Sequence, residues 1–282
     1  MVFHWFNKPY IKEYAVPVSI VVPVYRENPE ILYKCLKRCD EQEFVKEILV
    51  SIDGNDRKSY EVAKKFQKDS SKKVKIFFSR ERLGKRGAQA VAFKSVSAPI
   101  VVTVDSDTLL YPNAIKEIIK PFSDSQIGAV TGLLEVWNKD DNLLTKILNI
   151  RYIVAGALER AFYSYFKVVN CTSGPFSAYR TELVLANLDR YVNQIHRGKR
   201  CTFGDDRHLT NLILKQGYGV FFQKTARAKT IVPNTLKKFL RQQLRWSRSF
   251  WRETYLALHW SFKRSKILTL GMILDALLPF LY

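Results

Sequence analysis

Four short apolar runs, separated by stretches of helical pattern, constrain the fold of this chain more than any other feature. The runs are mostly apolar and each seven residues long: Val18–Val24, Glu47–Asp53, Lys73–Ser79 and Pro99–Asp105. Near-continuous apolar runs of this length are typical of strands that are buried on both faces of a parallel sheet. Helical patterns lie between them, near residues 29–43, 57–70 and 86–97. This alternation predicts an α/β fold with a doubly wound, mostly parallel sheet.

The excess of basic residues indicates an anionic partner. The chain has 46 Lys and Arg against 26 Asp and Glu, which gives a net charge of +20. Basic residues are densest between 224 and 266, where they mix with large aromatic side chains such as Trp246, Phe250 and Trp251. That mixture suits anionic lipid headgroups better than the groove of a nucleic acid. We therefore expect an amphipathic helix over 235–262 at a lipid membrane surface, and no nucleic-acid partner.

The two ends of the chain differ in character. Residues 1–17 form an aromatic and basic segment without the apolar core of a signal peptide. Residues 267–282 are apolar apart from Thr269 and Asp275, and these sixteen residues are fewer than the ~20 that span a bilayer. We expect either the start of a transmembrane segment or one interfacial segment there. The four cysteines lack metal-binding spacing, which favours reduced thiols and a cytosolic location.

Polar side chains follow the end of each predicted strand. They are Tyr25 and Glu27 after the first strand, Asp53 at the end of the second, Lys85 and Arg86 after the third, and Asp105 and Asp107 at the end of the fourth. In open α/β sheets, ligands bind in the crevice beyond the carboxyl ends of the strands. The sequence therefore predicts a binding site at this edge. It has no G-x-G-x-x-G after the first strand and no Walker A spacing around Lys85, so neither a dinucleotide site nor a P-loop is expected.

The pair Asp105 and Asp107 predicts a metal site. Two carboxylates just beyond a buried strand can hold Mg²⁺ or Mn²⁺ through one or two oxygens and leave coordination positions for substrate phosphates. The alternative is a pair of turn or N-cap acids before a helix near Pro112. The position after a buried strand favours the metal.

Three further residues fit a nucleotide diphosphate. Lys85 and Arg86 come just before a stretch rich in Ala and Val, and cations beside a helix N-terminus can hold a diphosphate together with backbone N–H groups. A solvated basic loop is the alternative. Asp53 at a strand end would accept hydrogen bonds from a uracil or a ribose, unless it is only a turn residue before Gly54.

A second acidic pair, Asp205 and Asp206, precedes another helical stretch. Asp205 can cap that helix, which leaves its neighbour without a structural explanation. Like charges raise each other's pKa, and a general base needs a pKa raised toward the working pH. We therefore expect Asp206 to act as a general base. The alternative is a role in capping and a salt bridge.

Two remaining motifs are suited to binding a sugar. Trp246 on a predicted amphipathic helix offers a flat apolar face for a sugar ring, and Gln242 and Arg245 beside it can hydrogen-bond hydroxyls or phosphate. Taken alone, such a pair of Trp and Arg is more typical of membrane anchoring. Ser173-Gly174-Pro175 joins two hydrophobic segments and could line an acceptor groove, although alone it is only a turn.

The ordered set of these motifs resembles the processive family 2 glycosyltransferases, a group that includes cellulose, chitin and hyaluronan synthases. The motifs are Pro23–Glu27, Asp53, Gly84-Lys85-Arg86, Asp105-Ser106-Asp107, Ser173-Gly174-Pro175, Gly204-Asp205-Asp206 and Gln242-x-x-Arg245-Trp246. Residues 187–194, 204–211 and 242–246 are most similar to hyaluronan synthases and rhizobial chitin-oligosaccharide synthases.

The resemblance implies a GT-A catalytic domain over 18–234 and an inverting, metal-dependent transfer of sugar from UDP-sugars to a growing polysaccharide. The UDP group would lie at Asp53, Lys85 and Asp105, and the metal would bind at Asp107. Asp206 would deprotonate the acceptor. Gln242, Arg245 and Trp246 would close over the donor and the acceptor end. The expected product is hyaluronan, made from UDP-N-acetylglucosamine and UDP-glucuronic acid at the cytoplasmic side of the cell membrane. Chitin or a chitin oligosaccharide is the alternative product. A basic membrane- or nucleic-acid-binding module without catalysis is less favoured.

Overall fold

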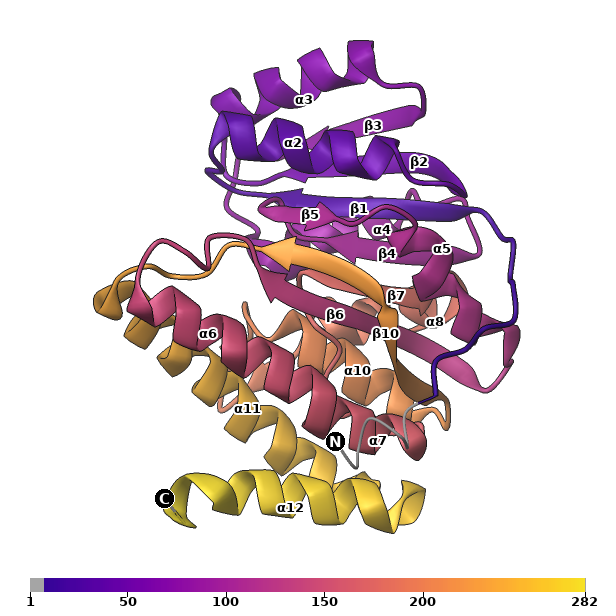
Figure 1. Ribbon diagram of the computed structural model, residues 1–282, viewed down its shortest axis with the longest axis vertical. Coiled ribbons are helices and arrows are strands. Elements are labelled where there is room, and N and C mark those ends of the chain that lie inside the picture. The colour runs from indigo at the N-terminus through magenta and orange to yellow at the C-terminus, as the bar shows by residue number, and fades with distance from the viewer. Residues whose placement is uncertain (1–7, 282) are drawn as a thin grey trace.

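The computed structural model describes residues 8–281, so residues 1–7 and Tyr282 of the two expected terminal segments lie outside the described residues. Eight strands form one sheet, and they are β1 (Val18–Val24), β2 (Val45–Ile52), β3 (Lys73–Phe78), β4 (Ile100–Val104), β5 (Thr108–Leu110), β6 (Ile127–Val136), β7 (Phe176–Arg180) and β10 (Gly219–Thr230). Their order across the sheet is β3-β2-β1-β4-β7-β6-β10-β5 (Figure 1).

The first half of the sheet is the predicted parallel arrangement. Strand β1 pairs in parallel with β2 and with β4, and β2 pairs in parallel with β3. The predicted helices between these strands are present as α2 (Pro29–Asp40), α3 (Arg57–Asp69) and α4 (Gly84–Phe93). All seven residues of β1 are buried, as expected of a strand that is covered on both faces. The alternation of apolar runs and helical stretches thus correctly predicted the order of these strands and helices along the chain.

The second half of the sheet is mixed rather than parallel. Strand β7 runs antiparallel to both of its neighbours, β4 and β6, and β5 runs antiparallel to β10. Strand β10 pairs in parallel with β6. These pairings join segments more than 40 residues apart, as in the register between Ile100 and Arg180, and no local pattern in the sequence specifies them.

Helices cover both faces of the sheet because alternate residues of each strand point to opposite sides. On one face, Ile20 and Val22 of β1 belong to a core that includes Leu36 of α2 and Phe66 of α3. On the other face, Val21 of β1 belongs to a core that includes Phe93 of α4 and residues of α10 (Asp205–Lys215). The predicted α/β sheet with helices on both faces is therefore confirmed, although the sheet is mixed.

The remaining described elements are short, except near the C-terminal end. They are α5 (Ala114–Ile119), the 3-10 turn η1 (Lys120–Ser123), α6 (Leu143–Val154), the π-helical turn η2 (Ala155–Arg160), α7 (Ala161–Tyr165), α8 (Thr181–Ala186), α9 (Leu188–Val192), the hairpin of β8 (Ile195–His196) and β9 (Lys199–Arg200), α11 (Leu236–Arg264) and α12 (Lys266–Leu281). Figure 1 shows α6, α11 and α12 at the end of the molecule opposite to α3.

The two expected terminal segments pack on this domain where they are described. Tyr10 donates a hydrogen bond from its hydroxyl to Asp124 and stacks edge-on against Phe221 of β10. Helix α12 contacts α11, and a Cβ on its Gly271 would lie 2.4 Å from the ring of Tyr163 in α7. Between residues 8 and 281, no helix is both long and apolar enough to cross a bilayer.

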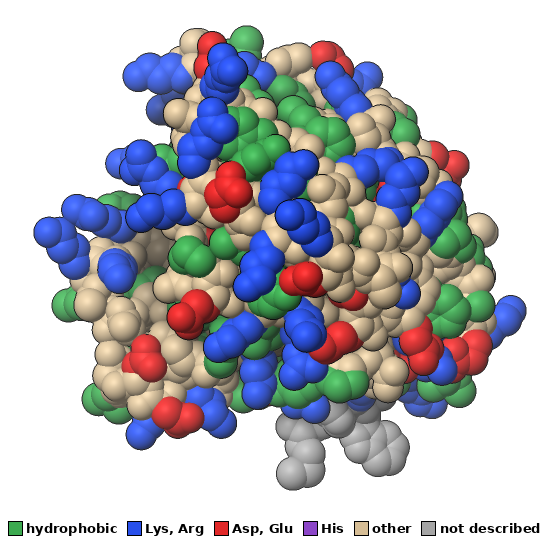
Figure 2. All heavy atoms as spheres, turned by 90° about the horizontal axis from the view of Figure 1, so that it is seen from above, with side chains coloured by type: hydrophobic (Ala, Val, Ile, Leu, Met, Phe, Trp, Pro, Cys, Tyr) green, Lys and Arg blue, Asp and Glu red, His purple; other side chains and the backbone are tan. Residues whose placement is uncertain are grey.

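Basic side chains are not confined to the segment 224–266. Figure 2, which looks onto the molecule from above the view of Figure 1, shows Lys and Arg outnumbering acids on that face. Helices α2 and α3 contribute the exposed basic residues Lys34, Lys37, Arg38, Arg57, Lys58, Lys64, Lys65 and Lys68. The positive field therefore surrounds much of the molecule.

Candidate active site

Side chains from four separate segments meet beyond the carboxyl end of β4. The ammonium nitrogen of Lys85 lies 2.7 Å from Oδ1 of Asp105 and 3.2 Å from Oδ2 of Asp205. Gly174 lies against the same group, because a Cβ added there would be 3.1 Å from Lys85 Nζ and 3.5 Å from Asp206 Oδ2. We call Lys85, Asp105, Gly174, Asp205 and Asp206 the lysine–acid cluster. It brings together residues that the sequence places at two strand ends, one turn and one helix start.

The carboxylates of the lysine–acid cluster outnumber its one ammonium group. Burial lowers the pKa of Lys85, but the negative charges of Asp105 and Asp205 outweigh it and raise that pKa overall. Lys85 therefore stays protonated. Three carboxylates surround this one ammonium group, so the cluster retains net negative charge and favours a further cation.

Asp107 lies beside this cluster in a second group of acids. Burial and the charges of Asp105 and Glu27 raise the pKa of Asp107 to about 7. The hydroxyls of Thr108 and Thr230 donate to Asp107 Oδ1 over 3.5 Å and 3.3 Å, and Ser106 donates to Glu27 over 2.8 Å. Thr230, at the end of β10, comes from a distant part of the chain and was not predicted. A bound cation would stabilise the ionised form of a carboxylate in this setting.

Asp206 has the environment that a general base requires. Burial and the charge of Asp205 raise its pKa above the usual value, although Lys85 and the backbone N–H of Arg207 act against that rise. The expectation that Asp205 caps the helix was wrong. Gly204 is the N-cap of α10, with a φ of 74°, and Asp205 is the first helical residue and pairs with Lys85. The left-handed backbone at Gly204 favours glycine.

Asp53, which was expected to bind a uracil or a ribose, is hydrogen-bonded to the loop before α4. Its carboxylate accepts hydrogen bonds from the backbone N–H groups of Leu83 and Gly84 and pairs with Arg82. The guanidinium of Arg82 in turn stacks on the ring of Tyr25, which is 39% exposed. Asp53 therefore fixes the loop before α4. Arg82 was not among the residues predicted for this site. Next to this loop, a hollow of about 450 Å³ lies between β3 and α4 and is lined by residues that include Phe77, Leu83 and Val91.

Ser173-Gly174-Pro175 passes directly over the end of β4. The backbone N–H of Asp105 donates to the carbonyl of Pro175, and the N–H of Ser173 donates to Thr131 of β6. Within the described part of the chain, the buried hydroxyl of Ser173 has no hydrogen-bond partner. Backbone hydrogen bonds therefore hold this turn beside Asp206. The turn was expected to line an acceptor groove.

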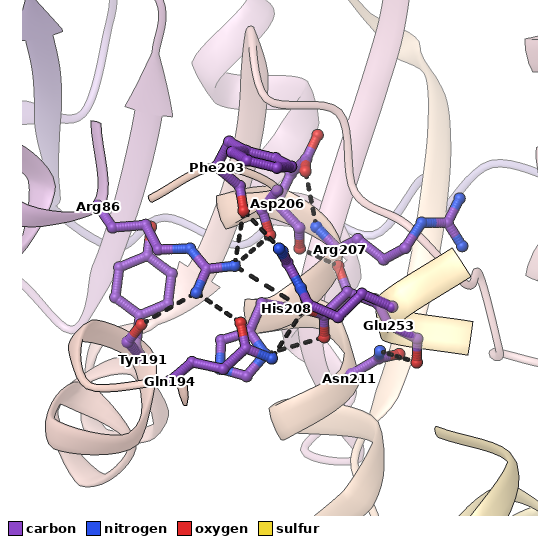
Figure 3. A network of polar contacts seen from close by, with 12 residues as sticks. Arg86, Tyr191, Gln194, Phe203, Asp206, Arg207, His208, Asn211 and Glu253 are labelled. Atoms are coloured by element: carbon purple, nitrogen blue, oxygen red, sulfur yellow. Dashed lines mark hydrogen bonds and ion pairs between the residues drawn. The ribbon is translucent and has the colours of Figure 1, made fainter. Parts of the chain in front are cut away.

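Arg86 is buried in a polar network rather than open to the lysine–acid cluster (Figure 3). Its guanidinium donates to the side-chain oxygen of Gln194 over 2.7 Å and to the carbonyls of Phe203 and Gly204 over 3.0 Å and 2.8 Å. These contacts engage both terminal nitrogens of the guanidinium, which was expected to bind a diphosphate. The adjacent Lys85 points to the cluster, so the two neighbouring cations separate into different environments.

Gln242, Arg245 and Trp246 lie on the first half of α11, and Trp246 is 40% exposed. In the described residues, no hydrogen bond or ion pair joins them to the lysine–acid cluster. One turn further on, a Cβ on Gly204 would lie 1.7 Å from the hydroxyl of Ser249. Residues 242, 246 and 249 follow the three- and four-residue spacing of one helix face, so this face of α11 is directed toward the start of α10.

Comparisons with known proteins agree with this geometry. A family model described as "Glycosyltransferase like family 2" matches residues 16–249. The chain is 39% identical over 251 residues to a hyaluronan synthase of Streptococcus pyogenes, covering 87% of this chain and 60% of that protein. It is 37% identical over 251 residues to an N-acetylglucosaminyltransferase of Rhizobium meliloti (strain 1021), covering 86% and 57%. The chain thus spans about 60% of the length of such curated relatives.

Solved structures share the fold at low sequence identity. The mannosyltransferase PcManGT from Pyrobaculum calidifontis, in complex with GDP-Man and Mn²⁺, has a TM-score of 0.68 at 17% identity and covers 100% of this chain and 88% of its own. The structure of GalNAc-T7 with UDP, GalNAc and Mn²⁺ has a TM-score of 0.57 at 13% identity and covers 77% and 43%. Both support the GT-A-like arrangement of a mixed sheet and flanking helices.

Proposed function

Because this chain belongs to the glycosyltransferase like family 2, we propose that it transfers a sugar from a UDP-sugar to a growing polysaccharide, with inversion at the anomeric carbon. The observation that carries the proposal is the lysine–acid cluster. It places a cation, Lys85, and a carboxylate of raised pKa, Asp206, next to each other against the same face of Gly174. One can neutralise a leaving diphosphate, and the other can accept a proton from the attacking hydroxyl.

Asp206 acts on the acceptor in this proposal. The acceptor hydroxyl loses its proton to the Asp206 carboxylate as its oxygen forms a bond to the anomeric carbon. The bond from that carbon to the diphosphate oxygen breaks on the opposite face, and UDP leaves with the electron pair. Ser173, Gly174 and Pro175 would hold the acceptor end next to Asp206, with Trp246 stacking on its sugar ring.

Donor binding is proposed for the residues around Asp53 and Lys85. Lys85 would pair with the diphosphate in place of Asp105 or Asp205. Asp53 and Tyr25 would contact the nucleoside after Arg82 moves away from them, and Glu27, Asp105, Gln242, Arg245 and Trp246 would complete the donor pocket. Arg86 would contribute indirectly, because its hydrogen bonds are already formed with the protein.

A divalent cation, Mg²⁺ or Mn²⁺, fits beside Asp107. The fit rests on the pKa of Asp107, which burial and the charges of Asp105 and Glu27 raise to about 7, because a cation would offset the cost of a buried charge and relieve the repulsion. Among residues 8–281, no three His, Cys, Asp or Glu side chains converge as a complete metal cage. The protein would thus supply one or two carboxylate ligands and leave the other positions to substrate phosphates, whose leaving charge such an ion stabilises.

The proposed product is hyaluronan, and the 39% identity to a hyaluronan synthase supports it. The 37% identity to an N-acetylglucosaminyltransferase supports the second candidate, a chitin-like oligosaccharide made from UDP-N-acetylglucosamine alone.

Incubation of the protein with each donor alone and with both, followed by hyaluronidase or chitinase digestion, distinguishes the two products. Long polymer only with both donors supports hyaluronan. Chitinase-sensitive oligomers that are unchanged by UDP-glucuronic acid support the alternative, and no UDP release from any UDP-sugar contradicts both.

A lipid membrane is the proposed location, with the catalytic domain on the cytoplasmic side. Large apolar side chains are exposed on α11 at Leu236, Leu240 and Leu244, and basic residues such as Lys237 and Lys238 lie between them. Such a helix can place its apolar side chains in the interface while its cations contact anionic headgroups. The apolar helix α12 would extend the same surface.

A further inference from the structure

A buried polar network joins the start of α10 to the second half of α11, and Glu253 lies at its centre (Figure 3). The Glu253 side chain is almost completely buried and accepts hydrogen bonds from Arg252 over 2.9 Å and Gln194 over 2.8 Å. His208 Nδ1 lies 2.9 Å from its other oxygen. A buried carboxylate with this many partners is held in one geometry, and each partner depends on its charge.

The partners of Glu253 contact the backbone just before Asp205 and Asp206. Arg252 donates to the carbonyl of Phe203 over 2.7 Å, and Arg86, bonded to Glu253 through Gln194, donates to the carbonyls of Phe203 and Gly204. These two carbonyls come immediately before Asp205 and Asp206. Two guanidinium groups oriented by one carboxylate thus fix the backbone that carries Asp205 and Asp206.

We propose that Glu253 is a positioning residue for sugar transfer: acting through Arg86 and Arg252, it holds the Phe203–Gly204 backbone so that Asp206 faces the acceptor. The same contacts fix α11, and with it Gln242 and Trp246, relative to Asp206. The inference rests on the proposed function, since it assigns Asp206 as the base. It places Glu253 outside direct contact with either substrate.

The first test compares Glu253→Gln with Glu47→Gln. Glu47 is a matched control, because it is also fully buried, pairs with Lys75 and accepts hydrogen bonds from Ser19 and Ser97. It lies near the start of β2, at the amino-terminal end of the parallel strands, whereas the lysine–acid cluster lies beyond the carboxyl end of β4. For Glu253→Gln we expect kcat for transfer to fall by about 10- to 100-fold, as for a misplaced catalytic group, with unchanged affinity for UDP. Glu47→Gln should lower the melting temperature and leave kcat unchanged.

A second readout does not depend on activity. Cys201 is buried, and its backbone N–H donates to the carbonyl of Gln194, so its thiol reports on the segment that the network holds. Alkylation of Cys201, located by peptide mapping, should become severalfold faster in Glu253→Gln and stay as in wild type in Glu47→Gln. If wild type transfers no sugar from any UDP-sugar, the proposed function fails, and this readout still tests the network.

A third comparison tests whether Arg86 and Glu253 affect kcat through the same contacts. Arg86→Met and Glu253→Gln should together reduce kcat no more than the worse single variant, because both act through the same backbone segment. Gln194→Ala removes the link between Arg86 and Glu253, and it replaces Glu253→Gln in these measurements if that variant does not fold. Wild-type kcat and wild-type Cys201 alkylation in folded Glu253→Gln would overturn the proposal. Weaker UDP binding in Arg86→Met would also overturn it and return Arg86 to the donor site.

Discussion

The ammonium group of Lys85 lies 2.7 Å from the carboxylate of Asp105, which joins the start of α4 to the end of β4. The same ammonium group lies 3.2 Å from Asp205, so one cation links three segments that are far apart in the sequence. A diphosphate entering this site would compete with both acids for Lys85. Donor binding is therefore expected to rearrange the charges around Asp206 as well as those around Asp107.

Asp206→Asn should reduce the transfer rate by about 10²- to 10⁴-fold, because an amide cannot accept the acceptor's proton. UDP affinity should stay close to that of wild type, since the proposed base acts on the acceptor and not on the nucleotide. Steady-state UDP release and isothermal titration with UDP provide the two measurements. Parallel loss of rate and of UDP affinity would indicate a structural role for Asp206 instead.

Asp107→Asn should reduce transfer by about 10²-fold or more, because the loss of a metal ligand removes several kcal/mol of charge stabilisation at the leaving diphosphate. It should also remove the dependence of UDP binding on Mg²⁺ or Mn²⁺. UDP titrations with and without each metal measure this. Glu61→Gln on the exposed side of α3 is the control, and it should keep both the rate and the metal dependence. Normal turnover in Asp107→Asn would rule out the metal assignment.

Gly204→Ala should lower the free energy of unfolding more than Gly198→Ala does. Both glycines have φ near 74°, and an L-residue in that conformation costs roughly 1–2 kcal/mol. A Cβ at Gly198 would contact nothing within 4 Å, whereas a Cβ at Gly204 would lie 1.7 Å from Ser249 Oγ. Urea unfolding of both variants isolates the packing of α11 on α10, and adding Ser249→Gly should recover part of the loss. Equal costs for the two alanine variants would contradict that packing.

Acid should remove the stability that Glu253 provides. Burial alone would raise its pKa, but contacts with His208, Gln194 and Arg252 lower it to about 2. A folded pKa below the unfolded value of about 4.3 gives stability that is present above pH ~4.3 and is lost as the pH falls toward 2. The difference in unfolding free energy between wild type and Glu253→Gln should thus be roughly 3 kcal/mol at most near neutral pH and shrink below pH ~4. Urea titrations at pH 7, 4 and 3 measure it, and a constant difference would contradict the shift.

Binding to anionic vesicles should depend on α11 rather than on total charge. Reversing Lys237 and Lys238 to Glu should weaken binding to phosphatidylserine vesicles at low salt by about tenfold or more, given roughly 1 kcal/mol for each basic residue at the surface. Reversal of Lys34 and Lys37, which are exposed on α2 away from the proposed membrane surface, makes the same change in net charge. Vesicle flotation compares the two. Equal weakening would show that only the overall positive field matters.

The sequence by itself determined the local parts of this protein. The apolar runs specified β1 to β4 and the helices between them, because buried strands need continuous apolar residues and surface helices need a one-sided pattern. Since Asp53 and Asp105 follow such runs directly, their place at the edge of the sheet was also predictable. The acid pair Asp205 and Asp206 could be recognised as unusual from its charges alone.

Only the tertiary structure decided which of these residues meet. Whether Lys85 or Arg86 turns toward Asp105 depends on where Phe203 and Gln194 supply acceptors, and those residues are more than 100 positions away. The antiparallel insertion of β7, the pairing of Asp205 with Lys85 and the hydroxyl of Thr230 beside Asp107 likewise arise from long-range packing. Spacing in a sequence reports on nearest neighbours along the chain, whereas a buried charge takes whichever partner the folded interior offers, because an unpaired charge there is too costly.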